Sequence, residues 1–340
     1  MISSEHLSLG DSECLSIKLM QSGLFSAALQ VQRQRLHSLT QLSPSHPVEY
    51  LRAGIAHIYL GNLQVAEELL SQPMNFSADY VPTKHALRQA QAYLSMCLTQ
   101  SFHPSKNLSR LSKDDRVFLA WARDKTALLI GPGQLSGQFN TVGEKVIARM
   151  PKEGTTSLSN SDPYPDRCEM AYVNSHTRAT VLNPREFFSK FPFVTFTSNC
   201  DFYAWKHSLT SWVRVQSNLG SVFWSGAAWL GIATVYDLLS APFDEIEVDG
   251  IDLFAGKIAY RTGSRQIRDG KQRDQFGKIG GEFERCRALA GHNPFVNRWI
   301  LRSMALSPRL KLSQVLRSVV SMPDCEYAEI LDTVYGQGRI

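Results

Sequence analysis

The sequence predicts an α/β protein in two parts. Residues 1–105 form an all-α region of helical hairpins, residues 106–123 a linker, and residues 124–340 a mostly parallel sheet with flanking helices. Apolar residues recur at helical spacing in the first part, whereas short β-branched and aromatic runs alternate with amphipathic stretches in the second. With 340 residues, 43% of them hydrophobic, the chain has ample material for a core, which excludes wholesale disorder.

The first region repeats one pattern, in which a glycine separates two helix-like stretches. Gly61 does so within residues 50–70, and Gly23 does so within residues 19–29; a third helix is expected over residues 84–99. The two glycines are 38 residues apart. This offset resembles degenerate tetratricopeptide repeats, whose usual period is about 34 residues. An ordinary helical subdomain is the alternative, and either one predicts scaffolding or the binding of a protein partner.

After the polar segment 101–115, the chain contains runs typical of strands buried in a parallel sheet. The expected strands are 126–131, 145–150, 169–174, 193–198 and 245–252, and the expected helices are 184–190, 227–239 and 294–304. Several runs end in Gly, Asn or Ser. This alternation favours a Rossmann-like layout, in which ligands bind at the carboxyl ends of the strands.

Charge and composition exclude several classes of function. The net charge of +5 is too small for the footprint of a nucleic-acid-binding protein. The six cysteines include no Cys-x-x-Cys pair, so neither a zinc site nor a disulfide framework is expected. The uncharged run 215–236 could span a bilayer by length, but its glycines and polar residues make it too polar for lipid, and we expect a buried strand, a turn and a helix there. No signal peptide is evident.

We therefore expect a cytoplasmic protein without a transmembrane segment. A basic surface could approach the inner membrane peripherally.

The strongest local motif lies in residues 127–137, where an expected strand leads directly into Gly131-Pro132-Gly133. Glycines at such a turn allow backbone amides to approach a phosphate, and a helix N-terminus nearby adds positive potential. The glycine spacing is not that of the dinucleotide fingerprint, and no Lys-Ser/Thr follows as in a P-loop. By itself the motif is also compatible with a plain strand-to-helix turn.

Four motifs follow one another in the order seen in the sialyltransferase family (glycosyltransferase family 29). They are the glycine turn at 131–133, a Ser-Gly helix start at 225–226, a strand ending in Gly-Ile-Asp at 250–252, and Gly-His-Asn-Pro at 291–294. From residue 124 to the C-terminus the chain resembles this family. The resemblance implies a sialyltransferase-type fold and transfer of an acidic sugar, sialic acid or Kdo, from its CMP donor to a saccharide or glycolipid acceptor.

The resemblance also implies roles for individual residues. His292 matches the late histidine that acts as general base, and an imidazole suits that task near neutral pH; a helix cap is the alternative role. The donor is expected to bind at strand ends and turns, through Gly131, Gly133, Gln134, Arg149, Asn174, Ser225, Gly226, Gly250, Asp252 and Tyr260. His176 is the second candidate for the base or a phosphate ligand, whereas His207 is expected to be structural.

The chain departs from the family at several positions. Pro151 stands where the family has an asparagine, and Asn297 where it has a glutamate. The disulfide of the animal enzymes has no matching cysteines, and the first motif is shortened between Gly137 and Gly143. These departures favour a bacterial relative. They also leave open a catalytically inactive binding scaffold, and the Gly-Pro-Gly turn leaves open a pterin pyrophosphokinase or flagellin-glycosylation protein.

No cofactor or metal is expected. CMP leaves with a single phosphate, so backbone amides and side-chain donors can replace a divalent metal, and the sequence contains no Asp-x-Asp motif. The segment 257–287 carries nine Lys/Arg and four Asp/Glu. Its net charge of +5 equals the net charge of the whole chain. It is interpreted as a lid that attracts an anionic ligand, with a solvated loop as the alternative.

Overall fold

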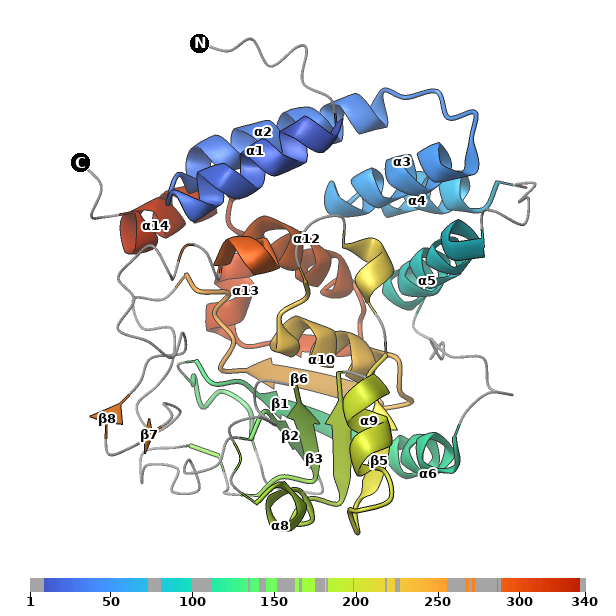
Figure 1. Cartoon of the computed structure of the whole chain (residues 1–340), viewed down its shortest axis with the longest axis vertical. Helices are drawn as coiled ribbons and strands as arrows, with labels where there is room; N and C mark the ends of the chain where they lie inside the picture. Colours follow the sequence, from blue (N-terminus) through green and yellow to red (C-terminus); the bar gives the residue numbers. More distant parts are fainter. Residues whose placement is uncertain are drawn as a thin grey trace.

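The computed structural model describes residues 9–72, 81–99, 112–133, 135–140, 145–151, 163–164, 167–174, 181, 183–197, 199–217, 219–223, 227–255, 267–268, 271–272, 286 and 289–336. Within these residues, seven strands form an all-parallel sheet in the order β5-β4-β3-β2-β1-β6-β9, flanked by helices (Figure 1). The predicted α/β class is therefore confirmed, as is the helical character of the N-terminal region.

Five of the sheet strands lie within the predicted runs. They are β1 (Thr126–Ile130), β2 (Val146–Arg149), β3 (Met170–Val173), β4 (Phe193–Phe196) and β6 (Glu245–Asp249). The edge strands β5 (Trp212–Val215) and β9 (Leu310–Leu312) are not predicted at these positions, since β5 carries Arg214 and β9 is very short. The strand expected early in 215–236 is not found there, since β5 shares only Val215 with that run. A separate antiparallel pair comprises β7 (Ile267–Arg268) and β8 (Lys271–Gln272).

The three helices expected in the second part are present. α12 (Pro294–Met304) has the expected bounds, whereas α8 (Pro184–Phe188) ends two residues early and α10 (Leu230–Leu239) begins three residues late. The described residues also contain helices for which the sequence gives no predicted range. These are α6 (Lys113–Ala122), α9 (Asn199–Trp205), α13 (Gln314–Ser321), α14 (Asp324–Tyr335) and the 3-10 turn η4 (Gly220–Val222).

Helix α6 lies within the stretch 106–123 that is expected to be a linker. Its start is a capping box, in which Ser112 and Asp115 each accept from the other's backbone N–H. Phe118 and Ala122 are fully buried. The polar composition around Ser112 therefore reflects a helix start, and the apolar face that follows packs into the core.

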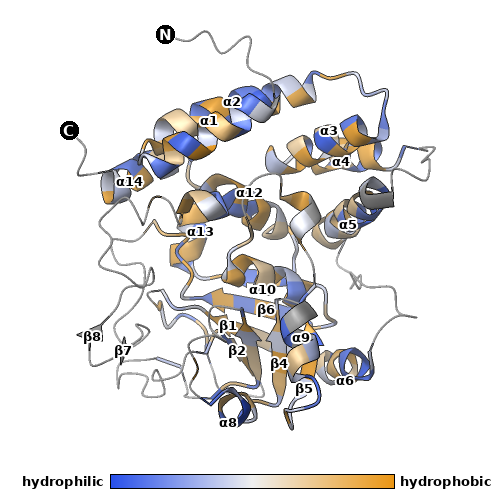
Figure 2. Ribbon diagram, viewed as in Figure 1, coloured by the Kyte–Doolittle hydropathy of each residue, from blue (hydrophilic) through white to orange (hydrophobic). Residues whose placement is uncertain are grey.

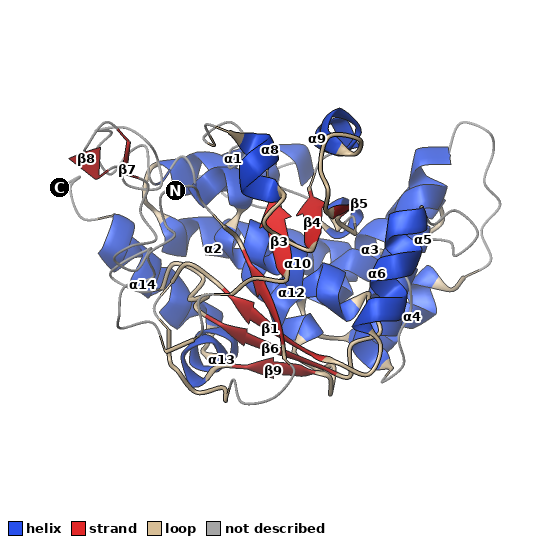
Figure 3. Cartoon of the chain, turned by 90° about the horizontal axis from the view of Figure 1, so that it is seen from below, coloured by secondary structure: helices blue, strands red, loops and turns tan. Residues whose placement is uncertain are grey.

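The strands β1, β2, β3, β4 and β6 are buried on both faces, as is usual for a parallel sheet. On β1, Ala127 and Leu129 belong to the large core that also contains residues of α10 and α12, whereas Leu128 and Ile130 pack with Tyr164 on the opposite face. Figure 2 shows predominantly apolar strands and a mixed surface on α1 and α2, and Figure 3 shows β1, β6 and β9 side by side. Burial on both faces explains why residues 127–130 of β1 appear in the sequence as a continuous apolar run.

The N-terminal region consists of two helical hairpins and a fifth helix. The hairpins are α1 (Leu9–Gln21) with α2 (Phe25–Thr40) and α3 (Pro47–Tyr59) with α4 (Leu63–Leu70), and the last helix is α5 (Val81–Leu98). Gly23 and Gly61 lie in the turns with φ of +73° and +80°, where glycine avoids a steric penalty. A Cβ on Gly54 would lie 2.5 Å from Leu70 Cγ, so the second hairpin is closely packed. Repeat ancestry stays a prediction.

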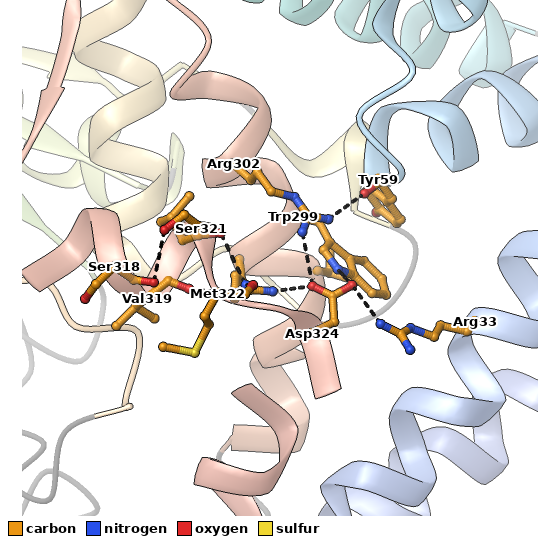
Figure 4. A network of polar contacts seen from close by, with 12 residues as sticks. Arg33, Tyr59, Trp299, Arg302, Ser318, Val319, Ser321, Met322 and Asp324 are labelled. Atoms are coloured by element: carbon orange, nitrogen blue, oxygen red, sulfur yellow. Dashed lines mark hydrogen bonds and ion pairs between the residues drawn. The ribbon is translucent and has the colours of Figure 1, made fainter. Parts of the chain in front are cut away.

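The N-terminal helices pack directly on the helices that cover the sheet, and both share one hydrophobic core. The Tyr59 and Trp299 rings lie 5.5 Å apart. Asp324, at the start of α14, accepts from Trp299 Nε1 at 3.0 Å and pairs with Arg302 at 3.1 Å and with Arg33 of α2 at 3.6 Å (Figure 4). This cluster connects the two ends of the chain.

In the described part of the chain, no helix has both the length and the apolar character that a membrane span requires.

Candidate functional site

The strand order creates a switch point between β1 and β6. From β1 the chain adds β2 to β5 on one side, and then returns to place β6 and β9 on the other side. In open α/β sheets, ligands bind at such a point, outside the carboxyl ends of the strands. The predicted segments 131–133 and 250–252 directly follow β1 and β6. The structure therefore brings these two segments together at the switch point.

Glycines allow the backbones of these two segments to touch. Gly131 N donates to Asp249 O and Gly133 N donates to Gly250 O, both at 2.7 Å. A Cβ on Gly131 would lie 2.3 Å from Gly250 O, and a Cβ on Gly133 would lie 2.8 Å from it. Gly250 itself has a φ of +70°, which favours glycine. The two amides expected to contact a phosphate thus already donate within the protein, and the glycines serve the close approach of the two loops.

Replacing Gly131 with alanine is expected to separate these loops. The added methyl would overlap Gly250 O, and such overpacking costs about 1–3 kcal/mol. The matched control is Gly291→Ala, because a Cβ at Gly291 meets no atom within 4 Å. Urea denaturation should show a loss for Gly131→Ala and little change for Gly291→Ala. Equal stabilities of the two variants would contradict the close packing.

A buried carboxylate, Asp249, anchors the chain that follows the glycine turn. It is 0% exposed and accepts from Tyr164 OH at 2.6 Å and from Ser136 N and Oγ at 2.9 Å. Burial and the hydrogen bond to Asp249 raise the pKa of Tyr164, so its phenol keeps the proton and remains a donor. Asp249 is not among the predicted site residues. An acidic residue at the carboxyl end of a predicted buried strand is the signal that could have found it.

The chain after β6 makes a turn with two left-handed residues. Leu253 and Phe254 have φ of +51° and +63°, a region that costs about 1–2 kcal/mol for a residue with a Cβ. Asp252 is largely buried, and its Oδ1 accepts from Phe254 N at 3.0 Å. Its carboxyl carbon would lie 3.7 Å from a Cβ on Gly133. The predicted donor-binding residues Gly133, Gly250 and Asp252 therefore lie together.

His292 is the last of the helical residues 289–292, which precede Asn293 and α12, and its Nδ1 lies 3.1 Å from Ala227 O. Because a carbonyl oxygen only accepts, Nδ1 carries the proton and Nε2 presents a lone pair. Burial lowers the pKa of His292 below 6.5, against the smaller opposing effect of the Ala227 hydrogen bond, so the imidazole is neutral at neutral pH. The cap of α12 is Asn293, whose side chain accepts from Val296 N at 3.3 Å. His292 is therefore not the N-cap of α12.

Trp229 and Asn297 connect the segment around His292 with the loop after β6. The Trp229 ring lies 4.7 Å from the Phe254 ring and 6.3 Å from the His292 ring. Asn297 is fully buried; its Oδ1 accepts from Trp229 N at 2.8 Å, and its Nδ2 donates to Ala227 O at 3.2 Å and to His292 O. Asn297, at the position where the resembled family has a glutamate, thus links the backbone of Trp229 and Ala227 to that of His292. Neither residue is among the predicted site residues.

Arg149 and Asn174 follow the strands on the side of β1 opposite to β6. Arg149 ends β2 in register with Ile130 of β1, is largely buried, and donates from Nε to Arg167 O at 3.1 Å. Asn174 follows β3, two strands from β1, which corresponds to about 10 Å. Both are at the carboxyl edge of the sheet, separated by β1 from the loop after β6.

The other predicted site residues lie outside the described residues: Gln134, His176, Ser225, Gly226 and Tyr260. The same holds for the basic segment 257–287, apart from β7, β8 and Cys286. His207 is described and lies exposed in the turn after α9.

Among the residues that the structure describes, no group of three or more His, Cys, Asp or Glu could hold a metal ion. Comparison of the chain with protein-family models, with curated proteins and with solved structures finds no match. A function therefore has to follow from the chemistry of the site itself.

Proposed function

We propose that this chain is a metal-independent glycosyltransferase that moves an acidic sugar, sialic acid or Kdo, from its CMP donor to a hydroxyl of a saccharide or glycolipid acceptor. The observation that carries the proposal is His292, a neutral imidazole whose Nδ1 is held by Ala227 O beside the switch point of the sheet. The proposal includes a sialyltransferase-type, Rossmann-like arrangement of the sheet, and a cytoplasmic reaction that takes place at the inner membrane when the acceptor is a glycolipid.

The proposed reaction requires a base on the acceptor side. The acceptor hydroxyl attacks the anomeric carbon and passes its proton to His292 Nε2, while the bond from that carbon to the phosphate oxygen breaks and CMP leaves with the electron pair. A neutral imidazole can take up this proton. The Nδ1–H bond to Ala227 O keeps the ring oriented and stabilises the imidazolium that forms.

The N-terminus of α10 supports the binding of an anionic donor. Its N-cap residue, Trp229, makes no side-chain hydrogen bond to the first turn. Gly231, within that turn, lies so close to the loop after β6 that a Cβ would be 2.8 Å from Ile251 Cδ1. Helix N-termini stabilise phosphate and carboxylate groups. We assign the phosphate to this end of α10, with Ser225 and Gly226 in the segment that leads to it.

Thermal denaturation with CMP, UDP and GDP tests this proposal. A ligand at about one hundred times its Kd stabilises the folded state by about 2.7 kcal/mol, which corresponds to about 4 °C in Tm for a chain of this length. We expect this shift with CMP and a smaller one with UDP or GDP. Equal shifts with all three nucleotides, or none, would contradict a CMP-sugar enzyme.

The alternatives give different results in the same assay. A binding scaffold would show the CMP shift but no release of CMP from a CMP-sugar in the presence of acceptors. A pterin pyrophosphokinase or flagellin-glycosylation protein would instead require a divalent metal for its reaction. Release of CMP in the presence of a chelator supports the proposed transferase against both.

A further inference from the structure

We propose that Tyr327 and Tyr335 of α14 are positioning residues for the site, because their hydroxyl groups hold the left-handed turn that supports Trp229 and, through it, His292. The effect of these two tyrosines on sugar transfer rests on the proposed function. Their effect on the geometry of the site does not depend on that function.

The two hydroxyls reach the carbonyls of the two left-handed residues. Tyr327 OH donates to Leu253 O at 2.7 Å, and Tyr335 OH donates to Phe254 O at 3.2 Å. Tyr327 is 0% exposed, and burial raises its pKa far above the ordinary value, so the hydroxyl stays protonated. Residues with a Cβ persist in this backbone region only where the surroundings hold them. The hydrogen bonds from Tyr327 and Tyr335 of α14 hold Leu253 and Phe254 in this conformation.

The turn transmits this support by ring contacts. The Phe254 ring lies 4.7 Å from the Trp229 ring, which in turn lies 6.3 Å from the His292 ring. A turn that relaxed toward ordinary φ values would carry Phe254 away from Trp229. The ring beside His292 would then lose its packing on one side.

Helix α14 is itself held from two directions, so it can serve as a fixed support. Asp332 accepts from Phe25 N at 2.5 Å and Ser26 N at 3.1 Å, and thus caps α2, whose own N-cap residue supplies no side-chain bond. On the other side, the Tyr327 ring meets Phe295 of α12 with centroids 6.0 Å apart. The N-terminal hairpin and α12 therefore both hold α14 against the site.

The test compares Tyr327→Phe and Tyr335→Phe with Tyr93→Phe. Tyr93 is an equally buried tyrosine, and its hydroxyl donates to Ile300 O at 2.8 Å, away from the turn. All three variants remove one hydroxyl and keep the ring, so similar decreases in Tm are expected. The indole N–H resonance of Trp229, identified as the signal missing from Trp229→Phe, should shift in the first two variants and stay in place in Tyr93→Phe.

A transferase assay separates this proposal from the proposed function. Misplacement of a catalytic group by about 1 Å can cost about 100-fold in rate, so we expect a 10- to 100-fold lower kcat in the two α14 variants and a retained CMP shift. A Trp229 resonance unchanged in both α14 variants, or shifted equally in Tyr93→Phe, would overturn the positioning role. If the resonance shifts but the wild-type chain transfers no sugar, the positioning role stands and the proposed function fails.

Discussion

His292→Asn is expected to reduce sugar transfer by about 100- to 10,000-fold, the usual contribution of a general base. Asparagine can still donate from its amide to Ala227 O, as His292 Nδ1 does, but it has no group in place of the Nε2 lone pair. The variant should therefore keep its fold and its CMP-induced rise in Tm. Steady-state kinetics and thermal denaturation of the same preparations measure the two effects.

The pH dependence of transfer gives an independent check on His292. The base must be deprotonated, and burial lowers its pKa below 6.5. Activity of the wild-type chain should therefore decline only as pH falls below 6.5 through that lowered value, and the variant should lose this limb. His207→Asn, in the exposed turn after α9, is the matched control. Full turnover of His292→Asn would move the base elsewhere, with His176 as the next residue to replace.

Asp237→Ala is expected to destabilise the fold by about 3–5 kcal/mol, because it removes the carboxylate that accepts two hydrogen bonds from the buried guanidinium of Arg214 and leaves only Asp115, 3.7 Å away, as its acidic partner. Asp237 is 0% exposed and Arg214 is 4% exposed. Arg214 donates to both carboxylate oxygens, at 2.5 and 3.1 Å, and Asp237 also accepts from Tyr172 OH at 2.8 Å and Ser217 N at 2.7 Å. Urea denaturation at neutral pH measures the loss.

Two comparisons sharpen this prediction. Glu245→Ala removes an exposed partner of Lys311, 4.0 Å away on the same sheet, and should cost less than about 1 kcal/mol. The double change Arg214→Met with Asp237→Leu removes both buried charges and should recover much of the stability. A loss in Asp237→Ala no larger than in Glu245→Ala would contradict the importance of the buried pair.

The same pair predicts how stability depends on pH. Burial alone would raise the pKa of Asp237, but the charge of Arg214 and the hydrogen bonds lower it below 3.8. The carboxylate therefore contributes its full stabilisation above pH 3.8, and loses it as pH falls through the lowered value. The difference in stability between the wild-type chain and Asp237→Ala should be constant near neutral pH and shrink in acid.

Much of the sheet is predictable because its central strands are buried on both faces. β1 is apolar from Ala127 to Ile130, so the sequence shows it as a continuous run, whereas β6 alternates Ile246 and Val248 with acidic residues. The edge strand β5 is different, since its Arg214 is buried against two acidic residues from other elements, Asp237 of α10 and Asp115 of α6. Because Arg214 interrupts the apolar run, the sequence alone does not indicate a buried strand there.

The candidate site divides in the same way. Gly131, Gly250, Asp252 and His292 belong to short local motifs, and the sequence identifies them. Trp229 and Asn297 carry no local signal. The contact of Trp229 with His292 depends on tertiary packing, in which Trp229 N at the start of α10 donates to Asn297 of α12.

The sequence alone determined the α/β class, the helical N-terminal region, the central strands and the glycine turns, because burial patterns and backbone sterics act over a few neighbouring residues. Only the tertiary structure decided that the amides of Gly131 and Gly133 are used within the protein, that His292 donates from Nδ1 to Ala227 O, and that Asp332 caps a helix 307 positions away. Hydrogen bonds between distant segments depend on where the packed elements bring them, and no spacing along the chain encodes that directly.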